Sequence, residues 1–311
     1  MQAQQQAAGA ALSGLAALPA GTKTGVAAVL ALTTAVLLNL GMPGLEGYSG
    51  WWPLLCLCLS PLLVTVQLCP AQAAGAGFFF GLCAYSGQLY WIVIVLGRYG
   101  GLPLWLSVPA LLLLAAYMAL YSALFCLLLS WLQHGAQENA SPGSMAFIRI
   151  WAPPLLWTGL DALRGVLFTG FPWMDLGYGL FLKPHLLLPA DLGGHHLLTF
   201  CLVLINAVCA LFLNAAWLRK PLWRGALPSL AAACALLIGL FVYSFLRAVE
   251  TREEIAAAPK AQIGVVQGNI EQDLKWSDDM KQATVERYLR YSAGLAAKGA
   301  ALVVWPETAL P

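Results

Sequence analysis

Long apolar stretches recur along the 311-residue chain and constrain its fold more than any other feature. A membrane-spanning helix needs about 20 mainly apolar residues. Hydrophobic residues make up 60% of the chain and charged residues 10%, against about 25% charged in soluble domains. We therefore predict a polytopic α-helical membrane bundle with about seven transmembrane helices. The predicted spans lie at 25–42, 53–69, 75–97, 103–132, 147–163, 195–217 and 227–247.

Charge is distributed unevenly and predicts where the membrane part ends. More than half of the charged side chains lie from Arg247 onward, although that part of the chain is much the shorter. We therefore predict an N-terminal segment over 1–24, a membrane domain over 25–247 and the start of a water-soluble domain over 248–311. The net charge of +2 is too small to favour nucleic acid as a partner.

Basic residues in short loops predict the orientation of the bundle. Arg219, Lys220 and Arg224 lie together between the sixth and seventh stretches, and such loops remain in the cytoplasm. The tail after Arg247 then lies on the opposite side of the membrane. The segment 164–194 lies on that side too. Its aromatic residues favour the membrane–water interface, so we predict an interfacial or re-entrant loop there.

The sequence of the tail predicts an α/β unit. The β-branched run 262–267 predicts a strand, and 301–305 predicts a second buried strand. Between them Ser277 is a capping residue for a helix that runs to about Lys298, where Gly299 ends it. One face of this helix is predicted to be buried, carrying Met280, Thr284, Tyr288, Tyr291 and Leu295.

Glu307 is the first candidate for chemistry. It follows the second predicted strand in Trp305-Pro306-Glu307, and reactive groups in α/β sheets collect at the carboxyl ends of strands. Pro306 restricts the backbone of that turn. By position alone, Glu307 is either a catalytic carboxylate or a solvated loop residue.

Three further polar or reactive features favour structural roles. We interpret Asp161 as the partner of Arg164 one turn on, rather than as a substrate-binding group. We expect no metal at His195-His196, because neighbouring side chains on a helix point in different directions. The eight cysteines lie in apolar stretches before Arg247, which is typical of small buried residues.

Several motifs together resemble the apolipoprotein N-acyltransferases, membrane members of the nitrilase-like carbon–nitrogen hydrolases. The segments that carry the resemblance are Phe78–Trp91, Phe168–Trp173, Leu176–Tyr178, Ile263–Ile270 and Val303–Pro311. Asp161 departs from the family, which tends to have glutamate there. The resemblance implies a bacterial inner-membrane protein whose periplasmic domain has a nitrilase-like α-β-β-α fold, here cut off inside that domain.

The resemblance also implies a reaction. In that family a Glu–Lys–Cys triad moves an acyl chain from a phospholipid to the lipidated N-terminal cysteine of an apolipoprotein, through a thioester and without a diffusible cofactor. Glu307 matches the general base. The matching Lys and Cys are expected beyond Pro311, since Lys281 and Lys298 do not match, so the 311 residues alone are predicted to be inactive.

Two other functions remain open at this stage. One is a non-catalytic membrane transporter or scaffold with a vestigial tail. Internal repeats and charged or broken helices would favour a transporter. The other is a membrane-anchored amidase that uses the same triad on a small C–N bond.

Overall fold

The computed structural model describes residues 19–44, 48–137, 140–218, 225–270, 278–307 and 309. The chain divides into two compact units, of which unit 1 ends at Ala248 and unit 2 begins at Val249. Most of the predicted segment 1–24, the basic loop with Arg219, Lys220 and Arg224, and the predicted cap Ser277 lie outside the described residues.

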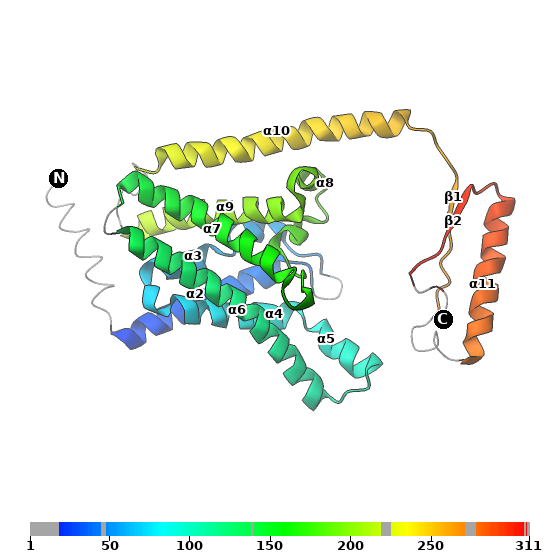
Figure 1. Ribbon diagram of the computed structural model, residues 1–311, viewed down its shortest axis with the longest axis horizontal. Helices are drawn as coiled ribbons and strands as arrows, with labels where there is room; N and C mark the ends of the chain where they lie inside the picture. The colour runs from blue at the N-terminus through cyan, green and yellow to red at the C-terminus, as the bar shows by residue number, and fades with distance from the viewer. Residues whose placement is uncertain are drawn as a thin grey trace. The chain divides into compact units, whose positions relative to one another are not determined.

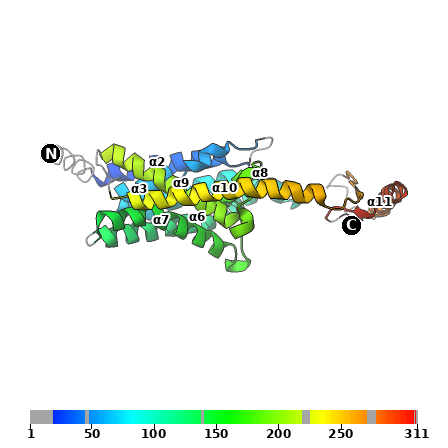
Figure 2. The same ribbon diagram turned by 90° about the horizontal axis from the view of Figure 1, so that it is seen from above.

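Unit 1 is a helical bundle. Figures 1 and 2 show α6, α7 and α9 running side by side along it, and α2 packs against α3 and α4. Its long helices are α2 (Ala20–Gly41), α3 (Ser60–Leu68), α4 (Ala73–Gln88), α6 (Leu104–Gln137), α7 (Pro142–Arg164), α9 (Ala190–Leu218) and α10 (Leu227–Ala257). Short elements join them: η1 (Trp52–Cys56), η2 (Pro70–Gln72), α5 (Trp91–Ile94), η3 (Val95–Tyr99), η4 (Leu167–Thr169), η5 (Leu176–Leu180) and α8 (Pro184–Leu187).

The predicted membrane bundle is confirmed, whereas the predicted number of spans is not reached. By length and composition, four helices of the described chain can cross a membrane, namely Ala20–Gly41, Leu104–Ala136, Ala190–Ala216 and Leu227–Ala257. A fifth is added if Trp52–Leu68 and Pro70–Gln88, bent by 117°, form one broken span. The helix α7 forms as predicted but is not among these candidates, because polar residues and two internal prolines interrupt it.

The two halves of the bent pair contact different parts of unit 1. The η1 segment contacts η5, at the end of the bundle where Tyr85 of α4 also meets Arg164. The bend itself lies towards the other end, where the carbonyl of Pro70 accepts a hydrogen bond from Ser130 of α6 at 3.4 Å. The predicted span 75–97 is wrong at its C-terminal end, because the helix breaks after Gln88 and continues as α5 and η3.

Asn206 of α9 forms hydrogen bonds with the backbone at the start of α3 inside the bundle. Its Oδ1 accepts hydrogen bonds from the backbone N–H groups of Leu59 and Ser60, at 2.8 and 3.1 Å. Its Nδ2 donates to the carbonyl of Leu55 at 2.7 Å. Asn206 is fully buried. Because lipid offers no hydrogen bonds to a broken helix, this side chain explains how η1 and α3 can meet in an apolar core.

Large apolar side chains cover much of the outside of unit 1. Leu113 is 76% exposed, and Trp131, Phe241 and Phe245 are also well exposed. A soluble protein seldom exposes so many large apolar side chains over a continuous surface. This surface therefore suits contact with lipid chains.

Unit 2 contains a strand–helix–strand arrangement. The strands β1 (Ile263–Val265) and β2 (Leu302–Val304) pair in parallel, with α11 (Asp278–Ala297) between them in the chain. Gly299 has a φ of +86°, which explains why the helix ends where predicted. The predicted helix face is right for Thr284, Tyr288 and Leu295 and wrong for Tyr291, which is exposed because the buried stripe continues instead through Ser292. Two strands do not amount to the layered nitrilase-like domain, so that domain stays a prediction.

Candidate functional site

Glu307 lies in an exposed turn directly after β2. The backbone N–H of Ala309 donates to the carbonyl of Pro306 at 3.2 Å and closes this turn. The preceding Trp305 is held by its indole Nε1, which donates to Ser292 of α11 at 2.8 Å, and by ring contact with Tyr288. The turn is thus anchored to the core of unit 2, while the Glu307 carboxylate remains accessible from solvent.

A buried ionic cluster occupies one end of the bundle in unit 1. Arg164 at the end of α7 is 1% exposed. Its Nη2 lies 3.1 Å from Asp161 Oδ1 and also bonds Asp175 Oδ1, and its Nη1 donates to the Tyr85 hydroxyl at 2.9 Å. One guanidinium therefore connects α7, α4 and the segment before η5. Since buried charges are stable only when paired, this cluster stabilises the arrangement of three segments.

The structure confirms one contact of this cluster and adds two that the sequence did not predict. The pair of Asp161 and Arg164 was predicted from their spacing, although both prove to be deeply buried. Asp175 and Tyr85 were not predicted to take part. Tyr85 is 79 residues from Arg164 in the chain, and no local pattern marks such a contact. An unpaired acidic residue near the aromatic loop was the only available signal for Asp175.

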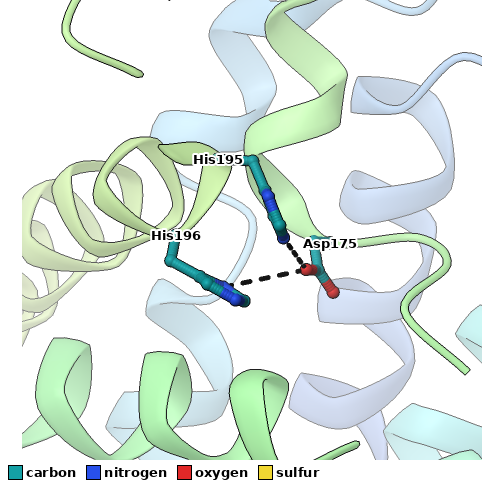
Figure 3. Close-up of side chains that lie close together, drawn as sticks. All are labelled: Asp175, His195 and His196. Atoms are coloured by element: carbon teal, nitrogen blue, oxygen red, sulfur yellow. Dashed lines mark ion pairs between the residues drawn. The ribbon is translucent and has the colours of Figure 1, made fainter. Parts of the chain in front are cut away.

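His195 and His196 both face Asp175, as Figure 3 shows. The Nε2 of His195 lies 2.8 Å from Asp175 Oδ2, and the Nδ1 of His196 lies 4.0 Å from the same oxygen. The argument that neighbouring histidines diverge is wrong here. Gly193 and Gly194 leave helical geometry, with φ values of −150° and +65°, so the two histidines follow a kink. Their ring centroids are 4.0 Å apart.

The segment between α7 and α9 carries both strain and aromatic side chains. Phe168, Thr169 and Met174 have positive φ angles, which non-glycine residues rarely adopt. The exposed Trp173 contacts Trp91 with ring centroids 5.4 Å apart. Burial, and then the nearby Asp175 carboxylate, raise the pKa of Tyr178. The predicted interfacial loop is thus built of short helical turns around the ionic cluster.

An apolar cavity of about 220 Å³ lies beside η1, between α8, α9 and α10. Its lining includes Trp52, Cys201, Leu202, Leu237 and Phe241. All eight cysteines of the chain are free thiols in unit 1, three of them buried. Residues 249–311 contain no cysteine, so unit 2 offers no thiol that Glu307 could deprotonate.

Comparison with known proteins identifies the family. Residues 34–208 match the family model described as the apolipoprotein N-acyltransferase N-terminal domain. A protein of Geobacter metallireducens named apolipoprotein N-acyltransferase is 35% identical over 285 residues, which is 91% of this chain and 51% of the relative. Proteins of the same name are 35% identical in Chromobacterium violaceum, over 85% of this chain and 46% of the relative, and 32% identical in Vibrio parahaemolyticus, over 84% and 47%.

The chain thus spans about half the length of the curated relatives it matches. The family model covers more than half of the 311 residues and falls within unit 1, and the pairwise matches extend further. The apolar helices of the bundle agree with this assignment. The chain belongs to the apolipoprotein N-acyltransferase family.

Proposed function

We propose that this chain supplies the membrane part and the general base of an enzyme that N-acylates apolipoproteins with a phospholipid as acyl donor. The observation that carries the proposal is family membership combined with the placement of Glu307, an accessible carboxylate on an anchored turn at the end of β2. We further propose that the domain containing Glu307 is nitrilase-like and lies in the periplasm, on the outer face of the bacterial inner membrane.

The proposed reaction has two steps. In the first, Glu307 removes the proton of a cysteine thiol, and the thiolate attacks an ester carbonyl of the phospholipid. A thioester forms, and the lysophospholipid alcohol leaves with the proton. In the second, the α-amine of the diacylglyceryl-cysteine attacks the thioester, an amide forms, and the thiol is restored. A positioned base is needed because the thiolate is the nucleophile.

The thiol and a lysine partner are assigned to a part of the enzyme outside these 311 residues. The cysteines within the chain lie in unit 1, where an apolar environment disfavours a thiolate. The bundle offers a surface suited to lipid and an apolar cavity of about 220 Å³, both of which favour an acyl donor over a small amide. The broken pair Trp52–Gln88 is a feature that transporters share, but the family match outweighs it.

The test compares two proteins in a strain depleted of its own N-acyltransferase. One is residues 1–311 alone, and the other is the same chain joined to the matching C-terminal half of the Geobacter metallireducens relative. Mass spectrometry of a lipoprotein should show the N-acylated form with the joined protein only. The intact relative serves as the positive control.

Two outcomes would contradict the proposal. If residues 1–311 alone restored N-acylation, the nucleophile would be one of the eight cysteines in unit 1. If the joined protein inserted at normal levels but left the lipoprotein unmodified, while the intact relative modified it, this chain would not supply the membrane part of such an enzyme.

A further inference from the structure

Three ligand atoms converge beside the buried ionic cluster. Asp175 Oδ2, His195 Nε2 and His196 Nδ1 all lie within 4.8 Å of one another. Each of these atoms is buried, and none has a hydrogen-bond partner among the described residues. His195 Nε2 and Asp175 Oδ2 lie within ion-pair distance, 2.8 Å. Buried polar atoms without hydrogen bonds are costly, so their convergence on one point requires an explanation.

The contacts of the ionic cluster leave one oxygen of Asp175 facing the two imidazoles. Asp161 and Asp175 supply two carboxylates, and Arg164 is the one guanidinium that pairs with them. Arg164 uses Asp175 Oδ1, which leaves Oδ2 to face the two imidazoles. A positive ion at Oδ2 would pair with this carboxylate oxygen, and buried charges are stable only when they are paired.

The position of the rings favours a metal ion over a proton. A proton on His195 would form one ion pair with Asp175, but it would leave His196 Nδ1, 4.0 Å from the oxygen, without a role. Two zinc ligands at about 2.0–2.2 Å in tetrahedral geometry lie roughly 3.4 Å apart. The distances of 2.8 and 4.0 Å bracket this separation. All three atoms lie within 4.8 Å of one another, so a single ion between them would draw the side chains closer together.

The surroundings of the rings resemble those of a prepared site. His195 stacks on Tyr178 at a centroid distance of 4.8 Å. The other oxygen of Asp175 is held by Arg164, which is the kind of outer contact that orients metal ligands. The carboxylate is 1% exposed, whereas the two histidine side chains are about one-third exposed, so the buried ligand atoms lie close to the surface of unit 1.

We propose that Asp175, His195 and His196 bind one divalent transition-metal ion, with zinc as the ion best suited to two imidazole nitrogens and one carboxylate oxygen. The ion joins the segment that follows α7 to the start of α9. Three protein ligands leave a fourth position for water. All three residues belong to unit 1, and the proposal does not depend on the proposed acyl transfer.

The experiment uses the full chain purified in detergent, treated with a chelator and then titrated with Zn²⁺. Calorimetry should show one zinc ion per chain, and the melting temperature should rise with zinc. The variant His195→Gln/His196→Gln should lose roughly 100-fold or more in affinity, since even outer-shell contacts are worth about 10–100-fold. It leaves the contact of Asp175 with Arg164 intact, so the bundle should still fold.

The matched control is His134→Gln, which changes a histidine of α6 that contacts only the Ser130 carbonyl among its recorded polar partners. It should bind zinc as the unchanged protein does. Equal zinc binding by the double variant would overturn the proposal. So would a protein that binds no zinc, whether or not its melting temperature depends on pH through His195 and His196.

Discussion

Individual polar residues explain how this apolar bundle tolerates breaks and charges. The side-chain amide of Asn206 accepts a hydrogen bond from Leu59 at the start of α3 and donates one to the carbonyl of Leu55. Arg164 contacts two carboxylates and a tyrosine hydroxyl. Each side chain replaces the hydrogen bonds or counter-charges that water would supply elsewhere. Such residues should dominate the response of unit 1 to mutation.

Replacing Asn206 with leucine should destabilise unit 1 strongly. The change keeps the approximate volume but leaves the buried N–H groups of Leu59 and Ser60 without acceptors. At about 1–3 kcal/mol for each unsatisfied group, the loss should be about 2–6 kcal/mol. Tryptophan fluorescence during thermal unfolding in detergent would measure it. Asn214→Leu is the control, because it removes one side-chain contact, to Gln67, and should cost less.

Glu307→Gln should abolish most of the acyl transfer without affecting insertion. Glutamine keeps the shape of the side chain but cannot take a proton, and general-base catalysis contributes about 10²–10⁴-fold. The measurement is the rate of thioester formation in the protein joined to the Geobacter metallireducens C-terminal half. Glu286→Gln, an exposed carboxylate of α11, should react normally. A near-normal rate for Glu307→Gln would leave Glu307 as a structural residue.

Among the elements, α9 links the bundle to the ionic cluster. The middle of α9 carries Asn206 in the core. Near its start, the kink at Gly193 and Gly194 turns His195 and His196 towards Asp175. A regular helix could not present both neighbouring side chains to one carboxylate. The kink therefore decides whether the three groups meet.

Gly194→Ala tests the kink. Gly194 has φ +65° and ψ −168°, a conformation that is essentially restricted to glycine and costs about 1–3 kcal/mol for other residues. An added Cβ would meet no atom within 4 Å, so any loss of stability reflects the backbone alone. The variant should melt earlier and bind zinc less tightly. Gly159→Ala in α7, which also meets no atom within 4 Å, should instead stabilise by about 0.5–1 kcal/mol. Equal effects of the two changes on stability and zinc binding would contradict the role proposed for the kink.

At the scale of the whole molecule, unit 1 has two distinct ends. Gly143 of α7 and Gly225 lie in contact at one end. At the other end Asp191, at the start of α9, pairs with Arg247 of α10 at 3.4 Å and accepts a hydrogen bond from Tyr243 at 2.7 Å. The ionic cluster lies at this second end. Gly225 and the pair of Asp191 with Arg247 thus lie at opposite ends of unit 1.

Reporter fusions should reveal this polarity across the membrane. A reporter that is active only in the periplasm should work after Lys260, which follows α10, and fail after Ala140 and after Arg224. The physical reason is that basic residues such as Arg219, Lys220 and Arg224 favour the cytoplasmic side for a short loop. The fusion after Ala140 is the matched control, because that position adjoins the same end of the bundle as Gly225. The reverse pattern would overturn both the orientation and the periplasmic assignment of Glu307.

The sequence by itself determined the class of this protein and most of its helices. Apolar length, prolines and glycines are local properties, so the stretches at 25–42, 103–132, 195–217 and 227–247 all correspond to long apolar helices, and Gly299 ends α11 as expected. The pair of Asp161 and Arg164 was equally predictable, because one helical turn fixes their distance. The position of Glu307 after a strand followed from the pattern of the tail.

Only the tertiary structure decided which distant polar groups meet. Asn206 reaches Leu59 across 147 residues and Arg164 reaches Tyr85 across 79, and neither distance leaves a periodic trace in the sequence. The break between η1 and α3 also depends on such a contact, because Asn206 supplies the hydrogen bonds that Leu55, Leu59 and Ser60 would otherwise lack inside an apolar core. His195 and His196 were misjudged for a related reason. Their direction depends on the backbone angles of Gly193 and Gly194, which glycine leaves free and packing selects.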